Sequence, residues 1–196
     1  RAMSRSLSGR SGASPSRGGP VAHEIIKGRL YYVALTRKPQ DTAKSLYFTT
    51  DNTLVYWNFF LDFGPLNLGQ TYRFCQKLNA KLRDPALEGT PIYFYSSTHP
   101  HRRTNAAFLI CAWMILYMNK TPQEAYAPFE GVQPPFTPFH DATPIACTYN
   151  LSVLDCLMGM AKARDFQFFS FDTFDCDEYE YYEQVENGDL NWYQEG

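Results

Sequence analysis

The residues best placed for chemistry lie in the polar stretch Ser97–Thr104, between an apolar run and a long uncharged segment. It holds a serine hydroxyl at its start, and Arg103 and Thr104 at its end. An arginine at a helix start suits a phosphate group, because backbone amides, helix dipole and guanidinium converge there. The residue types and their order therefore suggest a loop shaped for phosphate.

The same stretch lacks two features that phosphoryl chemistry needs. Ser97, five residues, Arg103 and Thr104 match the cysteine-phosphatase signature C-x-x-x-x-x-R-[ST], but serine replaces cysteine. A thiolate can attack phosphorus near neutral pH because its pKa can be lowered, whereas an unactivated serine cannot. Thr98–Arg102 also has no glycine to turn backbone amides inward. We expect a degenerate phosphate loop without phosphatase chemistry; the alternative is an ordinary strand-to-helix connection that never bound phosphate.

A strand and a helix must position this loop. Ile92–Tyr95 is apolar and β-rich, and we expect it to be the central strand of a sheet. The polar loop Ser96–Arg103 follows, and then Ala106–Met118, thirteen residues without a charge or an amide, predicts a buried helix. Strand, loop and helix in this order are typical of an α/β sheet that binds ligands at its carboxyl edge. We therefore predict an α/β fold, with a small mixed sheet flanked by helices.

The chain before this unit predicts three strands and one helix. The strands are at about 30–35, Leu46–Thr49 and Leu54–Tyr56, and the helix is Leu68–Leu82. Asp51–Asn52 is a turn signal, so we expect the second and third strands to form a hairpin. Asn67 is expected to cap the helix, whose positions Leu68, Tyr72, Cys75, Leu78 and Leu82 share one face.

The chain after it predicts two further helices. Thr121-Pro-Gln-Glu124 is a capping box with proline at the first helical position, and it predicts a helix over roughly 122–130. Gly131–Pro144 holds four prolines and is expected to be an extended connector. Thr148 or Asn150 is expected to cap a helix that ends near Ala163. Its inward residues are predicted to be Leu151, Leu154, Leu157, Met158 and Ala161.

Composition restricts the class of protein. Residues 1–20 carry four arginines and no acids, so we predict a disordered basic tail followed by one domain over 21–196. The formal net charge of the whole chain is −2, so without the four positive charges of the tail the domain has a net charge of −6. A negative net charge argues against nucleic acid as a partner. Five cysteines without a C-x-x-C pair indicate free thiols in a reducing compartment, nuclear or cytoplasmic. The run Ala106–Met118 is shorter than the ~20 residues that span a bilayer, so we expect no membrane association.

Seven motifs spread along the chain carry a resemblance. They are GRLYYVAL, NFFLDFGPLNLGQTYRFCQKLN, RRTNAAFLI, TPQEAYAPF, PPFTPFHDA, YNLSVLDC and DEYEYYEQVENGDLNW. Over Ile25–Trp192, about 85% of its length, the chain resembles the amino-terminal domain of the cell-division-cycle-fourteen family, the mitotic-exit dual-specificity protein phosphatases. The first 20 residues add nothing to this resemblance.

The resemblance implies a dual-specificity-phosphatase-like domain that is inactive by itself. Members of the family carry two such domains: the first lacks catalytic residues and helps to bind substrate, and the second carries the H-C-x-x-G-x-x-R signature. That signature is absent from this sequence. The chain is thus expected to be a fragment or truncated product of a cysteine-dependent protein phosphatase. Its expected partner is the carboxyl-terminal catalytic domain, and no cofactor or metal is expected.

The resemblance also implies a substrate-binding site near the end of the chain. The family acts on phosphoserine followed by proline and prefers a basic residue further on, and the implied acidic groove matches Glu180, Glu183 and Asp189. The two glutamates are three residues apart and share a helix face. The last 32 residues hold ten acids and no lysine or arginine, so we expect these carboxylates to be exposed and unpaired. The alternative is a merely solvated acidic face.

The same last 32 residues hold ten aromatic side chains. We expect those of Phe166–Trp192 to form an exposed apolar patch that meets the catalytic domain.

Other readings remain open at this point. The chain could be a stand-alone pseudophosphatase or phosphoprotein-binding module, or an active enzyme with an unrecognised nucleophile such as Cys156. His99 and His101 form a poor metal site without a clustered acid or thiolate, so we predict two loop histidines and no metal.

Overall fold

The structure is a computed structural model that describes residues 19–40, 42 and 44–190. The predicted basic tail therefore lies outside the described residues, except for its last two. None of the described helices is both long and apolar enough to cross a lipid bilayer.

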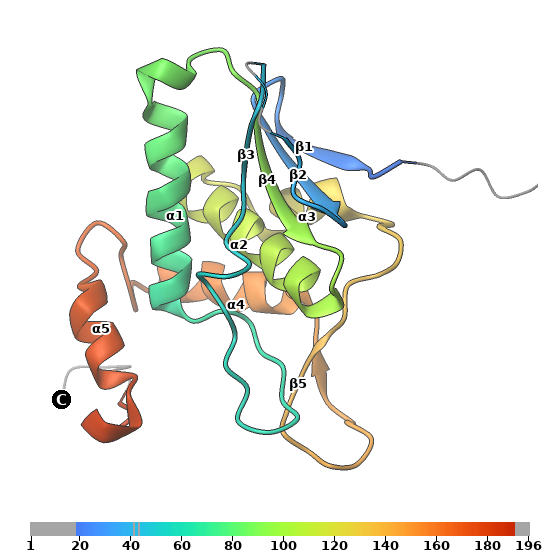
Figure 1. Ribbon diagram of the computed structural model, residues 1–196. Coiled ribbons are helices and arrows are strands. Elements are labelled where there is room, and N and C mark those ends of the chain that lie inside the picture. The colour runs from blue at the N-terminus through green and yellow to red at the C-terminus, as the bar shows by residue number, and fades with distance from the viewer. Residues whose placement is uncertain (1–18, 41, 43, 191–196) are drawn as a thin grey trace, which may run out of the picture.

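A four-stranded mixed sheet forms the centre of the molecule (Figure 1). Its strands, in spatial order, are β1 (Ala22–Ile26), β2 (Leu30–Leu35), β4 (Ile92–Ser97) and β3 (Leu46–Phe48). β1 is antiparallel to β2, whereas β2 and β3 both run parallel to β4. The prediction of a central strand at Ile92–Tyr95 is therefore confirmed. The parallel strands also bring their carboxyl ends to one edge, where Ser97 ends β4.

The predicted hairpin is wrong. Leu46–Phe48 pairs with β4, and Leu54–Tyr56 forms no strand. The chain turns at Thr50, whose carbonyl accepts the Leu54 amide at 2.8 Å. The Val55 carbonyl then accepts a hydrogen bond from Gln70 Nε2 on the following helix, also at 2.8 Å. Because these backbone groups find partners in a turn and a side chain, the β propensity of the segment does not produce a second strand.

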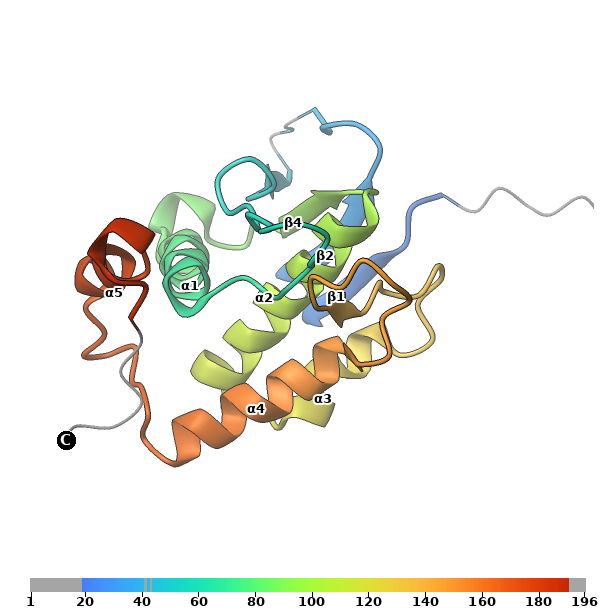
Figure 2. The same cartoon turned by 90° about the horizontal axis from the view of Figure 1, so that it is seen from below.

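The described residues form five α-helices, which cover the sheet and one another (Figures 1 and 2). They are α1 (Leu68–Arg83), α2 (Pro100–Met118), α3 (Pro122–Tyr126), α4 (Val153–Asp165) and α5 (Cys176–Tyr182). Every residue of Ala106–Ile115 in α2 is buried, which confirms the predicted core helix. Trp113 Nε1 donates to Asn79 Oδ1 at 2.8 Å and joins α2 to α1. α3 and α4 contact α2, and α5 contacts α1.

Two predicted helix starts are confirmed by their caps. Asn67 and Gln70 form a capping box at α1, and Thr121 and Glu124 form another at α3. α3 nevertheless ends at Tyr126 and passes into η2 (Ala127–Phe129), earlier than the predicted end near 130. Proline at position 128 explains the change, because it cannot donate the amide hydrogen bond that an α-helix requires.

The loop before α2 is shorter than predicted. β4 continues to Ser97 and α2 begins at Pro100, so two residues separate strand from helix rather than the whole of Ser96–Arg103. Proline suits the first helical position because its missing amide would have no intrahelical partner there. As a result Arg103 and Thr104 lie inside the first turns of α2, not in a loop.

The start of α4 also differs from the prediction. Ser152, not Thr148 or Asn150, caps the helix, in a capping box with Asp155. Leu151 lies in β6 (Asn150–Leu151), which pairs with β5 (Phe139–His140) within the proline-rich connector region. Leu151 and Met158 are exposed, which corrects their expected inward position, whereas Leu157 and Ala161 are buried as predicted.

Candidate functional site

At the end of β4, an aspartate takes the position that the sequence suggested for an anion. The Ser97 amide donates to Asp51 Oδ2 at 2.7 Å, and Arg102 Nη1 lies 3.7 Å from the same oxygen. The Asp51 side chain is only 11% exposed. Ser97 Oγ is buried and has no hydrogen-bond partner among the described residues. This negative carboxylate opposes the binding of a second anion at the strand end.

The arginine and threonine of the predicted phosphate loop hold another part of the chain. Arg103 Nη2 donates to the Pro134 carbonyl at 2.8 Å, and its guanidinium lies 5.3 Å from the centre of the Phe136 ring. Thr104 Oγ1 donates to the Thr137 carbonyl at 3.1 Å. Both side chains are buried. Arg103 and Thr104 thus contact the proline-rich connector, whereas the Ser97 amide donates to Asp51.

A cavity of about 660 Å³ lies at the same edge of the sheet, beside the start of α2. Its lining carries both signs of charge, with Asp51, Asp62 and Arg102 among the residues. His101 also lines it and stacks on Phe63, with ring centres 3.8 Å apart. Burial, His99 and His140 lower the pKa of His101, which favours the neutral ring.

No metal site appears in the part of the chain that the structure describes. Within residues 19–40, 42 and 44–190, no three His, Cys, Asp or Glu side chains are arranged to hold an ion.

Burial makes three of the cysteines poor nucleophiles. All five are free thiols. Burial raises the pKa of Cys75 and of Cys111, and raises the pKa of Cys156 to about 11. A thiol with a raised pKa is protonated near neutral pH and reacts poorly with phosphorus.

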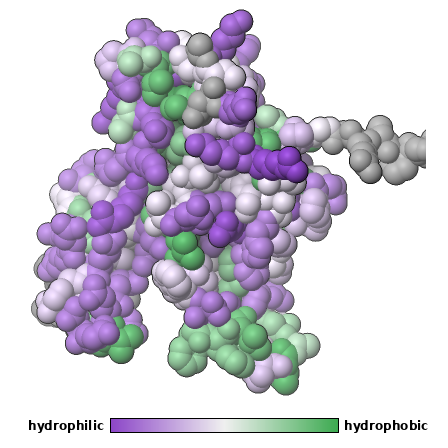
Figure 3. Space-filling view, in the orientation of Figure 1, coloured by the Kyte–Doolittle hydropathy of each residue, from purple (hydrophilic) through white to green (hydrophobic). Residues whose placement is uncertain are grey.

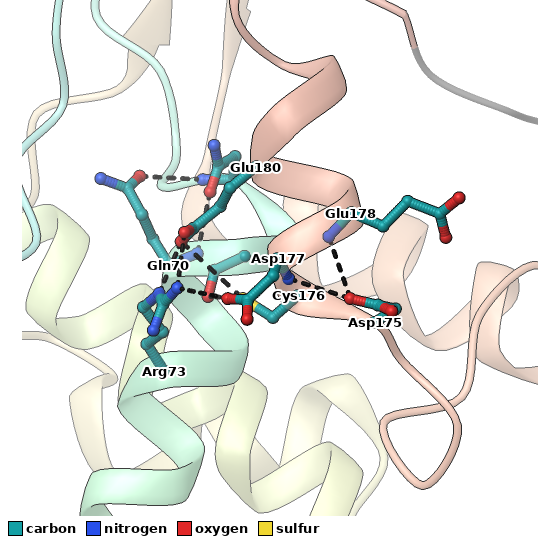
Figure 4. A network of polar contacts seen from close by, with 9 residues as sticks. Gln70, Arg73, Asp175, Cys176, Asp177, Glu178 and Glu180 are labelled. Atoms are coloured by element: carbon teal, nitrogen blue, oxygen red, sulfur yellow. Dashed lines mark hydrogen bonds and ion pairs between the residues drawn. The ribbon is translucent and has the colours of Figure 1, made fainter.

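The acidic helix α5 lies against α1 through an arginine that the sequence did not indicate (Figure 4). Arg73 donates from Nε and Nη2 to the two oxygens of Glu180, both at 2.5 Å. Its Nη2 also lies 3.3 Å from Asp177 Oδ1. The hydrogen bonds from Arg73 lower the pKa of Glu180. The expectation that Glu180 is unpaired is therefore wrong, because its basic partner comes from α1, 107 residues earlier.

Glu183 is also engaged by the start of α1. Its carboxylate accepts from Asn67 Nδ2 at 2.9 Å and from the Tyr179 hydroxyl at 2.7 Å. Asp189 is exposed and follows η3 (Val185–Asn187), after a glycine with a φ of 105°. The structure thus places both glutamates at the α1 contact, one on Arg73 and one on Asn67, and Asp189 beyond the next turn.

Close packing holds α5 in this place. A Cβ at Gly69 would lie 3.0 Å from Tyr179 Cδ1, so glycine lets the two helices approach. Tyr72 of α1 contacts Phe171 and Phe174, with ring centres 5.2 and 5.3 Å apart. Some of the aromatic side chains that we expected to be exposed therefore pack against α1 and help to hold α5 on the domain.

Exposed apolar side chains also gather at two loops outside Phe166–Trp192. The loop before α1 exposes Trp57 by 85% and Phe59 by 92%, and the β5–β6 loop exposes Ile145 and Tyr149. Figure 3 shows apolar surface at the end of the molecule where these two loops protrude. Within the predicted stretch the exposed large apolar side chains are Phe166, Phe168, Tyr181, Val185 and Leu190, and Trp192 lies outside the described residues. An apolar run at 57–61 next to a loop signal could have indicated the first patch.

Comparison with known proteins gives the family context of this geometry. The family described as dual specificity protein phosphatase, N-terminal half, matches residues 24–163. The chain is 51% identical over 172 residues to human dual specificity protein phosphatase CDC14A. This match covers 87% of the present chain and 29% of the human protein. The chain is 36% identical over 168 residues to tyrosine-protein phosphatase CDC14 of Saccharomyces cerevisiae. This match covers 86% of the present chain and 30% of the yeast protein. The chain therefore spans less than a third of these relatives.

Proposed function

Because the chain belongs to the family of N-terminal halves of dual-specificity protein phosphatases, specifically those of the CDC14 phosphatases of the cell cycle, we propose that it selects substrates without catalysing their hydrolysis. In this proposal a carboxyl-terminal half carries the catalytic cysteine and removes phosphate from serine followed by proline. The present chain receives a basic residue further along the substrate. The site of action is the nucleus and cytoplasm, during mitotic exit.

The single observation that carries this proposal is the placement of α5. Its carboxylates are concentrated on a helix that a packed interface fixes to the rigid α1. Carboxylates in fixed positions can recognise a lysine or arginine by charge-assisted hydrogen bonds. The pairing of Glu180 with a guanidinium supports this use, because it is the bidentate geometry with which a carboxylate recognises arginine.

The strand-end geometry supports the absence of catalysis. The nucleophile position holds a serine whose amide binds a carboxylate, and Arg103 is committed to the Pro134 carbonyl. Neither arrangement offers an anion the donors that stabilise phosphoryl transfer. Burial raises the pKa of the Cys111 and Cys156 thiols, which makes both of them poor alternative nucleophiles.

The exposed loops support a second domain as the partner. Trp57, Phe59 and Ile145 are large apolar side chains that a monomeric surface rarely presents together. The relatives extend well beyond the length that this chain spans, so a further domain is available to cover them.

The first test measures turnover by the purified chain. We expect no hydrolysis of an aryl phosphate above the background of buffer, because serine stands at the nucleophile position and burial raises the pKa of Cys111 and Cys156. As a control, the variants Cys111→Ser and Cys156→Ser are assayed in parallel. Turnover by the wild-type chain that either substitution abolishes would show that the chain is an enzyme and would overturn this part of the proposal.

The second test measures selection in the full-length protein. Two phosphoserine-proline peptides are compared that differ only downstream, where one has lysine and the other norleucine. We expect a higher kcat/KM for the lysine peptide at about 50 mM salt, and a smaller difference at about 500 mM, because salt screens exposed charges. Equal values for the two peptides at low salt would contradict selection of a basic residue.

A further inference from the structure

Arg73 occupies the acidic face of α5 in the way a substrate arginine would. Its guanidinium contacts both oxygens of Glu180 and one oxygen of Asp177, as Figure 4 shows. In the described part of the chain, every ion pair of α5 is made by this one arginine. The internal cation and an external one would therefore compete for the same carboxylate oxygens.

The pairing is open enough to be exchanged. The Arg73 side chain is 47% exposed and that of Glu180 is 38% exposed. Half-exposed ion pairs contribute little net stability, because water solvates the separated charges well. A cation from solution can thus approach Glu180 without first opening the protein core.

The position of α5 does not depend on Arg73 alone. Asn67 holds Glu183, Tyr179 packs on Gly69, and the buried Cys176 faces α1 near the Gly69 carbonyl. These contacts keep the helix on α1 when the guanidinium moves away. Movement of Arg73 therefore changes the charge of the acidic face rather than its place.

We propose that Arg73 is an internal competitor for the substrate's basic residue and so sets the strength of substrate selection by α5. This inference rests on the proposed function. A substrate lysine or arginine either displaces the guanidinium from Glu180 or binds the remaining carboxylates, whose electrostatic attraction for it is weakened by Arg73. In both cases Arg73 weakens binding of the cation, because it neutralises one carboxylate and repels a second positive charge.

The test is a titration of the isotope-labelled chain, followed by amide chemical shifts. The probes are a short Ser-Pro peptide with a downstream lysine and its norleucine counterpart, at about 50 mM salt. We expect Arg73→Gln to bind the lysine peptide roughly two- to fivefold more tightly than wild type, the range of a half-exposed ion pair. The norleucine peptide should bind each variant alike.

The matched control is Lys77→Gln, one turn further along α1. It removes the same charge from an exposed residue that makes no ion pair among the described ones. We expect its affinity for the lysine peptide to equal that of wild type. An equal gain in this variant would show a general charge effect and would overturn the specific role of Arg73.

The remaining outcomes separate the two proposals. Suppose that wild type prefers the lysine peptide, that Arg73→Gln does not bind it more tightly, and that the amide chemical shifts of residues 176–182 are unchanged by the substitution. The inference about Arg73 is then wrong, while the proposed function stands. If every variant binds the two peptides alike, the proposed selection itself fails. If Arg73→Gln releases α5, Arg73→Lys decides. It keeps the charge with fewer contacts, so tighter binding than wild type supports the inference, and unchanged binding overturns it.

Discussion

Replacing both Glu180 and Glu183 by glutamine in the full-length protein is expected to slow dephosphorylation of a lysine-containing peptide roughly ten- to a hundredfold. This range corresponds to the loss of one or two charge-assisted hydrogen bonds to the substrate. Glutamine is preferable to lysine here, because a lysine at 180 would face Arg73 and repel it. A glutamine oxygen still accepts hydrogen bonds from Arg73 and Asn67, so α5 should remain docked.

The measurement is kcat/KM for peptides with and without the downstream lysine. Glu178→Gln is the control for the loss of one carboxylate from the same helix, since its side chain points away from the Arg73 cluster in Figure 4. We expect normal rates for the control variant, and normal rates for all variants on the peptide without lysine. A similar loss on both peptides would show that the two glutamates support structure rather than selection.

Truncation of Arg103 to alanine is expected to destabilise the fold by about 2–4 kcal/mol. The substitution removes a buried guanidinium that donates to the Pro134 carbonyl and packs over the Phe136 ring, and it leaves a cavity in its place. For a chain of this size, the melting temperature should fall by about 5 to 15 °C. In a working phosphate loop the equivalent arginine would serve the ligand, and its loss would reduce activity far more than stability.

Arg102→Ala tests whether the effect belongs to the buried side chain. Its neighbour Arg102 is 46% exposed and lies 3.7 Å from Asp51, so we expect a loss of less than about 1 kcal/mol. Thermal unfolding of both variants supplies the comparison. Equal losses, or a wild-type melting temperature for Arg103→Ala, would show that Arg103 does not hold the connector.

The elements that the sequence predicted best are those whose signals are local. The capping boxes at Asn67 and Thr121 lie within four residues, and each places a helix start correctly. Ser152 and Asp155 form a third box of the same kind, which we overlooked in favour of Thr148 and Asn150. That error lies in the interpretation, because the signal was present in the sequence.

The errors with a physical origin concern pairing over long distances. Leu46–Phe48 has enough β propensity for a strand, but propensity cannot say whether it pairs with a neighbouring hairpin partner or with β4. The partner of Glu180 was equally hidden, because Arg73 lies 107 residues away and only packing brings them together. The acidic composition of the end of the chain indicated the residue types of the site but not their partners.

Asn67 couples the start of α1 to the end of α5. Its Oδ1 accepts the Gln70 amide and so starts α1, and its Nδ2 donates to Glu183, 116 residues later. One amide side chain therefore contacts both the first turn of α1 and the residue that ends α5. A substitution at Asn67 would consequently remove a cap from α1 and a contact from the end of α5 at the same time.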